Sequence, residues 1–378
     1  MITNTQVKKK LLIFHQALAP YRVDFWNTFS KYFNTEIHFI YENHLDQHFD
    51  QDRLKSFFHL TPNYLKNGFQ IGSRAFRSGF LAVIQRFKPD IVFTYEYSQT
   101  TWFVYLLKRI FGFQYKIYSV CDDSLDIAKN CTGLRALSRN YLVERIDGLI
   151  LINDEVADWY TNKFKKNNWI VFPITYQEEG FRAGLTTALD RSNSIIKENG
   201  LVGKKCIFFV GRFVAVKGID RLLEAFAKIA ADYPNAALIL IGAGDQRNEL
   251  LNLSTKLGIQ QQVLFAGRHE GNELLAWYNV GQIFVLPSHY EPYGAVVNEA
   301  LLAGAKVLCS NLAGASSLIV PGLNGDIFNP FDTVELSILM ERELDNIEPI
   351  FELKAIRESK TPFVFDQLFD DLLKKLNV

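Results

Sequence analysis

Residues 204–244 read KKCIFFVGRFVAVKGIDRLLEAFAKIAADYPNAALILIGAG. The apolar run CIFFV ends at a turn, and the segment after it carries apolar residues at the spacing of an amphipathic helix, LLEAFAKIA. A second apolar run, ALILI, follows that helix. A strand, a helix and another strand in this order are typical of a parallel βαβ unit, so the stretch predicts an α/β fold.

The same alternation fills most of the chain. The runs QVLFAG, QIFVLPS and AKVLCS predict further strands downstream, and KKLLIFH, TEIHFIYE, DIVFTYE and YKIYSV predict strands upstream. A chain of 378 residues is too long for one ordinary core and about right for two domains. We therefore expect two doubly wound domains, with ligands at the carboxyl ends of the strands, in a cleft between the two sheets.

The domain borders follow from where the alternation stops and restarts. We expect the first domain at residues 1–175, an irregular polar linker at residues 176–203, and the second domain at residues 204–360. Residues 361–378 predict an amphipathic helix that either crosses back to the first domain or caps the second.

Composition narrows the class of protein. A hydrophobic content of 48% and a charged content of 22% are those of a soluble globular protein. The net charge is zero, but residues 1–173 carry 22 basic and 16 acidic side chains. A basic first half suggests an anionic partner, such as a phospholipid surface or a phosphate-bearing acceptor; an uneven scatter of surface charge is the alternative. Nucleic-acid binding is not expected, because no readout motif is present.

The cysteines and the apolar runs indicate a cytoplasmic location. The four cysteines have neither zinc-site spacing nor the density of a disulfide scaffold. Lys8–Lys10 precede only five apolar residues, which is too short for a signal peptide or a membrane span.

A first candidate site is the turn of the opening stretch. Gly211, Arg212, Lys217 and Gly218 lie between a strand and a helix, where backbone N–H groups, the positive helix end and two cations can hold an anion. The pattern is neither a Walker loop nor GxGxxG, and a solvated Arg and Lys on a loop is the alternative.

A second candidate is the stretch PSHYEPYGAVVNEALLAGAKVL, residues 287–308. Residues 291–294 form a loop whose following N–H groups open a helix and can cradle hydroxyls or phosphate. Glu299 lies in an apolar helix, where a carboxylate is costly unless it accepts hydrogen bonds, and adjacent sugar hydroxyls would supply them. The alternative partner for Glu299 is a nearby arginine. The triplet DQD at residues 50–52 lies in a polar stretch and is interpreted as a solvated loop, not a metal site.

These motifs, in this order, resemble the donor-binding half of glycosyltransferase family 4. The resemblance is carried by VGRFVAVKGIDRLLEAF, GRHEGNELLAWYNVGQIFVLPS and the two glutamates, and it covers residues 203–330 closely and the first half more loosely. It implies the GT-B fold of two Rossmann-like domains facing across a cleft, a nucleoside diphosphate sugar donor, no metal or other cofactor, and retention of configuration.

The resemblance also implies roles for single residues. Arg212 and Lys217 would hold the donor diphosphate, Glu299 would bind the ribose, and Glu291 would orient the sugar. The remaining donor contacts would come from Gly211, from Arg268 and His269 in the loop edging the base, and from Pro292, Tyr293, Gly294 and Ala295. With Asp122, the residues Arg212, Lys217 and Glu291 would form the catalytic set.

The acceptor side is matched less closely. Family members often have a glycine-rich turn after the first strand, whereas this chain has FHQALAPYRVDFW, whose APYR form resembles the subset that builds bacterial surface polysaccharides, including lipopolysaccharide and capsule. The implied acceptor contacts are His15, Tyr21, Arg22 (to an anionic acceptor) and Glu96. Asp122, in CDD after a strand, would contact the transferred sugar or the acceptor hydroxyl, and a helix N-cap is its alternative role.

The predicted function is a retaining, metal-independent hexosyltransferase that acts on a glycan or lipid-linked acceptor. The expected location is the cytoplasm, either free or at the inner face of the membrane. The basic and aromatic stretch at residues 73–88 would rest on an anionic membrane or, alternatively, pack on its own sheet. Alternative functions are an epimerase or phosphorylase on the same fold, or a non-catalytic nucleotide-sugar-binding scaffold.

Overall fold

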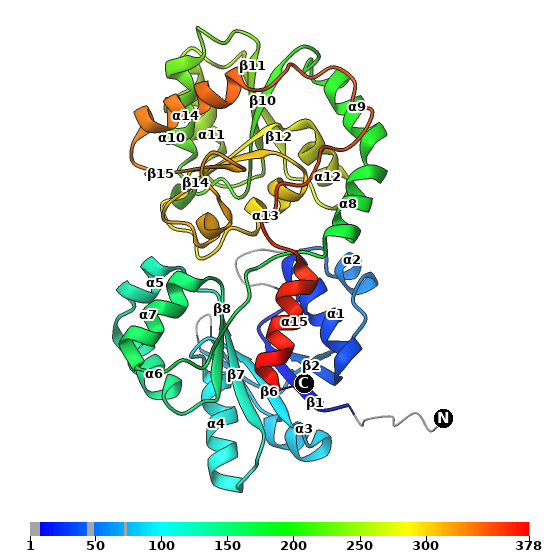
Figure 1. The fold of residues 1–378 in the computed structure, drawn as a ribbon, viewed down its shortest axis with the longest axis vertical. Helices are drawn as coiled ribbons and strands as arrows, with labels where there is room; N and C mark the ends of the chain where they lie inside the picture. Colours follow the sequence, from blue (N-terminus) through cyan, green and yellow to red (C-terminus); the bar gives the residue numbers. More distant parts are fainter. Residues whose placement is uncertain (1–7, 44–48, 72–73, 378) are drawn as a thin grey trace. The chain divides into compact units, whose positions relative to one another are not determined.

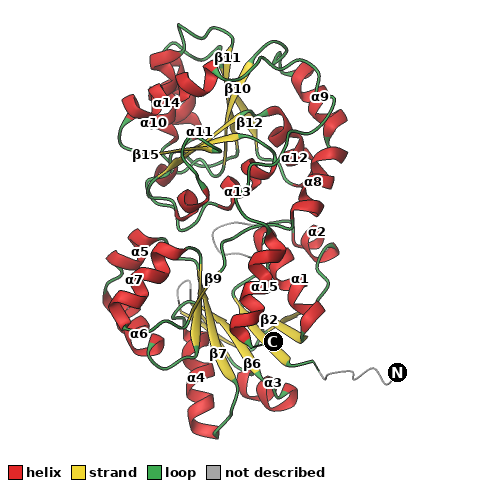
Figure 2. Cartoon of the chain, viewed as in Figure 1, coloured by secondary structure: helices red, strands yellow, loops and turns green. Residues whose placement is uncertain are grey.

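The computed structural model describes residues 8–43, 49–71 and 74–377. The chain forms two compact units, one of residues 1–174 and 368–378 and the other of residues 175–367. Each unit contains one all-parallel sheet flanked by helices, as Figures 1 and 2 show. The prediction of two Rossmann-like doubly wound α/β units is therefore confirmed.

The first unit is built on a seven-stranded sheet in the order β3-β2-β1-β6-β7-β8-β9. Its strands are β1 (Lys10–His15), β2 (Asn34–Phe39), β3 (Pro62–Tyr64), β6 (Ile91–Tyr95), β7 (Lys116–Cys121), β8 (Gly148–Leu151) and β9 (Trp169–Val171). A separate hairpin pairs β4 (Gly68–Ile71) with β5 (Arg74–Arg77). The helical segments are η1 (Pro20–Arg22), α1 (Val23–Tyr32), α2 (Gln51–Ser56), α3 (Phe80–Phe87), α4 (Gln99–Phe111), α5 (Leu125–Asn130), α6 (Gly133–Val143) and α7 (Asp154–Phe164).

The last helix of the chain, α15 (Phe365–Leu376), packs in the first unit. Its Phe369 ring lies 4.8 Å from the Phe29 ring of α1 and 6.0 Å from the ring of Phe172. Figure 1 shows this helix, in red, beside the blue α1. The apolar face of the predicted helix is thus buried against α1.

The second unit is built on a six-stranded sheet in the order β12-β11-β10-β13-β14-β15. Its strands are β10 (Lys205–Val210), β11 (Ala236–Ile241), β12 (Val263–Gly267), β13 (Ile283–Leu286), β14 (Lys306–Ser310) and β15 (Gly325–Phe328). The helical segments are α8 (Glu178–Thr187), α9 (Leu189–Glu198), η2 (Ala215–Lys217), α10 (Ile219–Ile229), α11 (Arg247–Lys256), α12 (Gly271–Val280), α13 (Ala295–Leu302), η3 (Gly314–Leu318) and α14 (Thr333–Asp345).

The expectation of an irregular linker at residues 176–203 is wrong. This segment forms α8 and α9, which pack on α12 of the second unit. The Arg191 guanidinium holds the Glu273 carboxylate at 2.9 Å, and the Asn279 side chain donates to the Leu185 carbonyl at 2.8 Å. The segment has few apolar residues and four glycines, so its helical pattern is weak until tertiary contacts are present.

One shorter expectation in the first half also needs correction, and one pair of alternatives can be compared with the structure. Asp50 of the DQD triplet caps α2, because its carboxylate accepts a hydrogen bond from the Arg53 N–H at 3.0 Å. The described part of the stretch at residues 73–88 forms β5 and then α3, and the Phe80 ring of α3 packs 4.9 Å from Phe14 of β1. Ser73 lies outside the described residues. Throughout the described chain, every helix is too short or too polar to cross a membrane.

Candidate functional site

The candidate donor site lies where β10 and β13 end, because these strands are parallel neighbours. The loop after β10 runs through η2 to Gly218, and the loop after β13 begins at Pro287. The His289 N–H donates to the Val216 carbonyl at 3.0 Å and ties the loops together. Gly218 has a φ of +63°, and a Cβ there would lie 2.4 Å from the Pro287 carbonyl oxygen, so only glycine allows this approach.

Two of the predicted site residues meet between these loops. The Lys217 ammonium forms an ion pair with the Glu291 carboxylate, and the two side chains are only 13% and 11% exposed. Arg212, on the same turn as Lys217, is exposed. In the β13 loop, the fully buried Ser288 hydroxyl has no hydrogen-bond partner among the described residues. No sequence pattern pointed to Ser288, which offers this loop an additional donor group.

The loop after β13 presents the start of α13. Gly294 adopts a left-handed conformation with a φ of +96°, and no side chain caps the helix at this residue. The Ala315 N–H donates to the Tyr293 carbonyl at 2.7 Å, and the Gly314 N–H donates to the Glu291 carbonyl at 3.3 Å. The loop backbone from Glu291 through Pro292 to Tyr293 is therefore fixed, while the Ala295 end of the helix lacks a side-chain cap.

Glu299 lies within α13. Its hydrogen-bond partners are two tyrosines, not the arginine considered as the alternative. The Tyr278 hydroxyl of α12 donates to one carboxylate oxygen at 2.6 Å, and the Tyr176 hydroxyl donates to the other. Burial raises the pKa of Glu299, while the two hydroxyl donors lower it. Neither tyrosine was predicted as a site residue, because each lies in a different element from Glu299.

A cationic side chain holds the ends of the helices that carry Tyr278 and Glu299. The Arg357 guanidinium donates to the carbonyls of Tyr278 at 2.8 Å, Gly281 at 2.6 Å and Ala303 at 3.2 Å. Burial lowers the pKa of Arg357 to about 10. Carbonyls at helix C-termini lack partners within the helix, so Arg357 stabilises the geometry that brings Tyr278 to Glu299.

Arg268 and His269 follow β12, which is separated from β10 by β11. The His269 ring lies 5.9 Å from the Trp277 ring, and its Nε2 contacts the Ala266 carbonyl at 2.9 Å. Arg268 is exposed and forms an ion pair with Glu270. Both predicted residues therefore lie on the carboxyl edge of the same sheet as Lys217.

The predicted acceptor residues lie on the carboxyl edge of the first sheet. The strand order β1-β6-β7 brings the ends of these strands together, where His15, Glu96 and Asp122 lie. His15 contacts the Tyr95 ring at 5.7 Å. Tyr21 is half-buried in η1 after β1.

Asp122 is held by a buried arginine. Arg22 is 1% exposed and donates to the Asp122 carboxylate, whose own side chain is 31% exposed. Ser124, not Asp122, caps α5, since its hydroxyl accepts from the Ile127 N–H at 3.4 Å. The alternative N-cap role of Asp122 is therefore wrong. Because Arg22 is buried, this structure does not present its guanidinium to an anionic acceptor.

A second ion-pair group lies beside Asp122. The Arg135 guanidinium donates to Asp123 at 2.6 and 2.8 Å and to Glu96 at 3.3 Å. Glu96 has a φ of +45°, an uncommon conformation for a residue with a side chain. Burial and the Asp123 charge raise the pKa of Glu96, and Arg135 lowers it. Asp123 was signalled by its place in CDD, whereas no sequence pattern pointed to Arg135.

The described residues do not contain a group of three or more His, Cys, Asp or Glu side chains arranged to hold a metal ion.

Comparisons with known proteins show what the chain is similar to. Residues 191–349 match the model of the family described as glycosyl transferases group 1. An uncharacterized glycosyltransferase of Methanocaldococcus jannaschii is 39% identical over 122 residues, which are 32% of this chain and 31% of that protein. A second uncharacterized glycosyltransferase of the same organism is 26% identical over 314 residues, 80% of this chain and 75% of that protein.

The match to the first of these relatives spans about a third of its length. Among solved structures, Anabaena HepE in complex with UDP has a TM-score of 0.75 and 17% identity, covering 97% of this chain and 99% of HepE. At that identity the likeness shows the fold alone. Residues 191–349 thus resemble the glycosyl transferases group 1 family, in a chain with the two-unit Rossmann-like fold of GT-B glycosyltransferases.

Proposed function

We propose that this protein is a retaining glycosyltransferase that transfers a hexosyl group from a nucleoside diphosphate sugar to a hydroxyl of a glycan or lipid-linked acceptor in cell-surface polysaccharide synthesis. The observation that carries the proposal is the pairing of Lys217 with Glu291 beside the uncapped start of α13. Both residues lie within the segment that matches the glycosyl transferases group 1 family.

In this proposal the donor separates the Lys217–Glu291 pair. The diphosphate forms an ion pair with Lys217. Arg212 supplies a second cation, and the α13 N-terminus supplies a third positive group. Glu291 then accepts hydrogen bonds from the donor sugar, and the Glu299 carboxylate accepts them from the ribose. Because two cations and a helix end neutralise the departing nucleotide, the transfer needs no metal ion.

The chemical step follows from these roles. The acceptor hydroxyl oxygen bonds to the anomeric carbon while the bond from that carbon to the diphosphate oxygen breaks. The leaving diphosphate takes the hydroxyl proton, so attack and departure occur on the same face and configuration is retained. Asp122 is proposed to position the acceptor hydroxyl, and the rate gain comes mainly from positioning and charge stabilisation.

A binding measurement tests the donor site. UDP, GDP, ADP and CMP are titrated into the protein by calorimetry with EDTA present, starting with UDP because HepE was solved with it. One nucleotide should bind, and Glu299→Ala and Arg212→Ala should each weaken it about tenfold or more. Binding that requires a metal would overturn metal independence, and no binding by any nucleotide would overturn the donor site.

Product analysis separates the alternative functions. Incubation with the matching nucleotide sugar, with and without glycan or lipid-linked acceptors, should release nucleotide and form a glycoside only when acceptor is present. Conversion of the sugar without acceptor would instead indicate an epimerase, and formation of a sugar 1-phosphate from a glycan and added inorganic phosphate would indicate a phosphorylase. Binding without any turnover would indicate a scaffold.

We also propose that a lipid-linked acceptor is met at an anionic membrane, through an apolar face of α4 and α6. The two helices touch, since the rings of Trp102 and Tyr141 stack at 4.8 Å. Large apolar side chains point outward at helical spacing from both helices: Phe103, Leu106 and Ile110 on α4, and Leu134, Leu137 and Tyr141 on α6. Large exposed apolar side chains on two neighbouring helices are typical of an interaction site.

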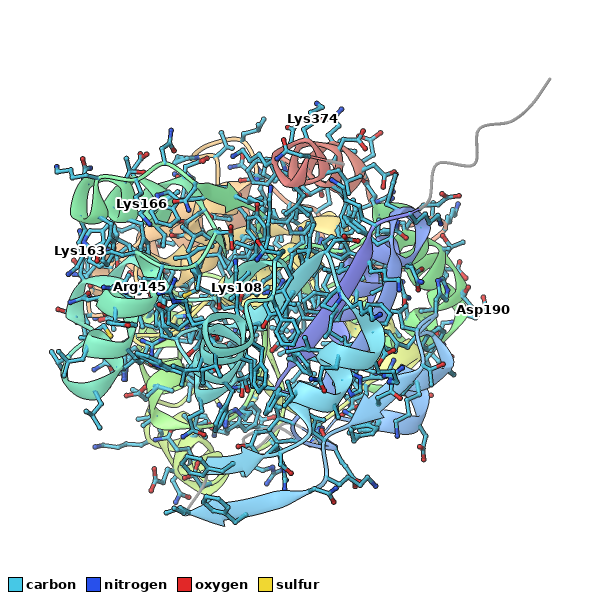
Figure 3. The ribbon with its side chains drawn as sticks, turned by 90° about the horizontal axis from the view of Figure 1, so that it is seen from below. Lys108, Arg145, Lys163, Lys166, Asp190 and Lys374 are labelled. Atoms are coloured by element: carbon cyan, nitrogen blue, oxygen red, sulfur yellow. The ribbon has the colours of Figure 1, made fainter. Side chains whose placement is uncertain are left out.

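Charge next to this face favours an anionic surface. Arg145 lies over the Tyr141 ring at 3.8 Å, Lys108 lies 3.3 Å from Asp147, and Lys166 donates to the Glu144 carbonyl at 2.5 Å. Figure 3 shows Arg145, Lys163 and Lys166 on one side of the view, with Lys108 nearer its centre. Cations near an apolar helix face match the headgroups and acyl chains of an anionic bilayer.

Vesicle co-sedimentation tests the membrane surface. Binding should be stronger to phosphatidylglycerol-containing vesicles than to phosphatidylcholine alone, and Ile110→Ser with Leu134→Ser and Leu137→Ser should reduce it about tenfold or more. The matched control is Leu323→Ser with Ile338→Ser in the second unit, whose side chains are 70% and 57% exposed. Equal loss in the control, or no loss in either, would contradict the α4–α6 surface.

A further inference from the structure

The Glu299 carboxylate is held from two sides by two tyrosines of different burial. Tyr278 is fully buried in α12, whereas Tyr176 is half-buried at the start of the second unit. The Phe181 ring of α8 lies between them, 5.4 Å from Tyr176 and 6.4 Å from Tyr278. Tyr278 therefore reaches Glu299 from the interior of the unit, and Tyr176 reaches it from the more exposed side.

The neighbour of Glu299 holds the backbone next to Tyr176. The Asn298 side-chain oxygen accepts from the Tyr176 N–H at 3.3 Å and from the Thr175 hydroxyl at 3.2 Å. The Asn298 amide donates to the Thr361 hydroxyl at 3.4 Å. Residues 175 and 176 begin the second unit, so α13 holds the start of this unit through the two adjacent residues Asn298 and Glu299.

A ribose at Glu299 would use the groups that the tyrosines now occupy. A carboxylate binds two adjacent hydroxyls by accepting one hydrogen bond on each oxygen. Each Glu299 oxygen already accepts a tyrosine hydroxyl. A ligand that enters from solvent approaches on the Tyr176 side, because Tyr278 and the core of the unit cover the other side.

We propose that the Tyr176 hydroxyl takes the place of one ribose hydroxyl and competes with the donor nucleotide for Glu299, while the Tyr278 hydroxyl orients the same carboxylate for the ribose. Both tyrosines are positioning residues, and the inference rests on the proposed donor site. When the nucleotide binds, the ribose displaces the Tyr176 hydroxyl. Donor binding therefore loosens the side-chain contact between Tyr176, at the start of the second unit, and α13.

The two tyrosines should therefore act on nucleotide binding with opposite signs. Calorimetry on the full chain compares UDP with 2′,3′-dideoxy-UDP, which lacks the ribose hydroxyls. Tyr176→Phe should tighten UDP binding about threefold to tenfold, and Tyr278→Phe should weaken it about tenfold, as expected for one charge-assisted hydrogen bond. Neither change should alter the affinity for dideoxy-UDP, because that ligand does not use Glu299.

A matched control lies in the same unit. The Tyr233 hydroxyl donates to the Asp345 carboxylate at 2.8 Å, and Tyr233→Phe should leave both affinities unchanged. Thermal unfolding of each variant shows whether the fold is kept. A variant that merely disturbed packing would weaken UDP and dideoxy-UDP alike, and this outcome would overturn the assigned role.

A measurement on the unmodified chain provides a second test. UDP should speed the amide hydrogen exchange of residues 174–178, because Tyr176 is released, and dideoxy-UDP should not. If UDP binds better than its dideoxy form but Tyr176→Phe weakens or does not change binding, the competition is overturned while the donor site stands. If neither UDP, GDP nor ADP binds, the donor site itself fails. Where ADP or GDP binds instead, its dideoxy form replaces dideoxy-UDP.

Discussion

The carboxyl edges of the two sheets hold their charges in different ways. In the second unit, Lys217 pairs with Glu291 across two adjacent loops, and the carboxylate of Glu299 is held by neutral hydroxyls. In the first unit, Arg22 pairs with Asp122, and Arg135 with Asp123 and Glu96. The second edge thus holds its carboxylates with a lysine and two tyrosine hydroxyls, while the first holds its carboxylates with two arginines.

This difference suits two kinds of ligand. The turn after β10 brings two cations, Arg212 and Lys217, to the donor edge, which favours a diphosphate. The first edge has three carboxylates and two guanidinium groups, so it favours neutral hydroxyls over anions. The sequence-based expectation that Arg22 binds an anionic acceptor is therefore less favoured than a hydroxyl contact through Asp122.

The largest expected effect comes from breaking the Lys217–Glu291 ion pair. Lys217→Ala removes the cation that neutralises the departing nucleotide, and turnover should fall about 100-fold to 1,000-fold, more than the affinity for the donor. Steady-state kinetics with the matching nucleotide sugar measures both. Lys228→Ala, an exposed lysine on α10, should keep full activity. Equal losses in kcat and affinity would contradict a role centred on the leaving group.

A second variant examines the Arg22–Asp122 ion pair in the first unit. Asp122→Ala leaves the buried Arg22 without its carboxylate, which should destabilise the protein by about 3 kcal/mol in urea unfolding, in addition to lowering transfer. UDP binding should be unchanged, because the donor residues lie in the other unit.

The double variant Arg22→Met with Asp122→Leu separates the two contributions. It replaces the ion pair by apolar side chains and should recover most of the lost stability without recovering transfer. Full transfer activity in the double variant would show that Asp122 acts only through stability, and the two edges would then differ in packing alone.

The contrast also explains what the sequence could predict. The βαβ alternation gave both sheets, and the spacing of Glu291 and Glu299 along one loop and helix made the donor candidates visible, because those relations are local. Arg22 and Asp122 are 100 positions apart, and their pairing depends on strand order and on burial that no local pattern encodes. The helices α8 and α9 were missed for a related reason, since packing on α12 stabilises a segment with weak helix propensity.

The smallest expected effect concerns the pH dependence of Glu299. Burial raises its pKa above the ordinary value of 4.5, despite the two hydroxyl donors that lower it. As pH rises above about 4.5, the unfolded chain releases the Glu299 proton before the folded protein does. Stability contributed by this group is therefore fully present at lower pH and is lost as pH rises through the folded-state pKa.

Glu299→Gln removes the titration and keeps the shape of the side chain. From pH 4.5 upward, the free energy of unfolding of the wild type should fall relative to that of the variant, with a slope of at most about 1.4 kcal/mol per pH unit. Over the same window UDP affinity should rise with pH in the wild type only, because the ribose hydroxyls need an ionised acceptor. The idea is contradicted if unfolding free energy and UDP affinity vary with pH in the same way for wild type and variant. In that case neither the burial of the Glu299 carboxylate nor its contact with ribose would distinguish the donor edge from the arginine-held edge of the first unit.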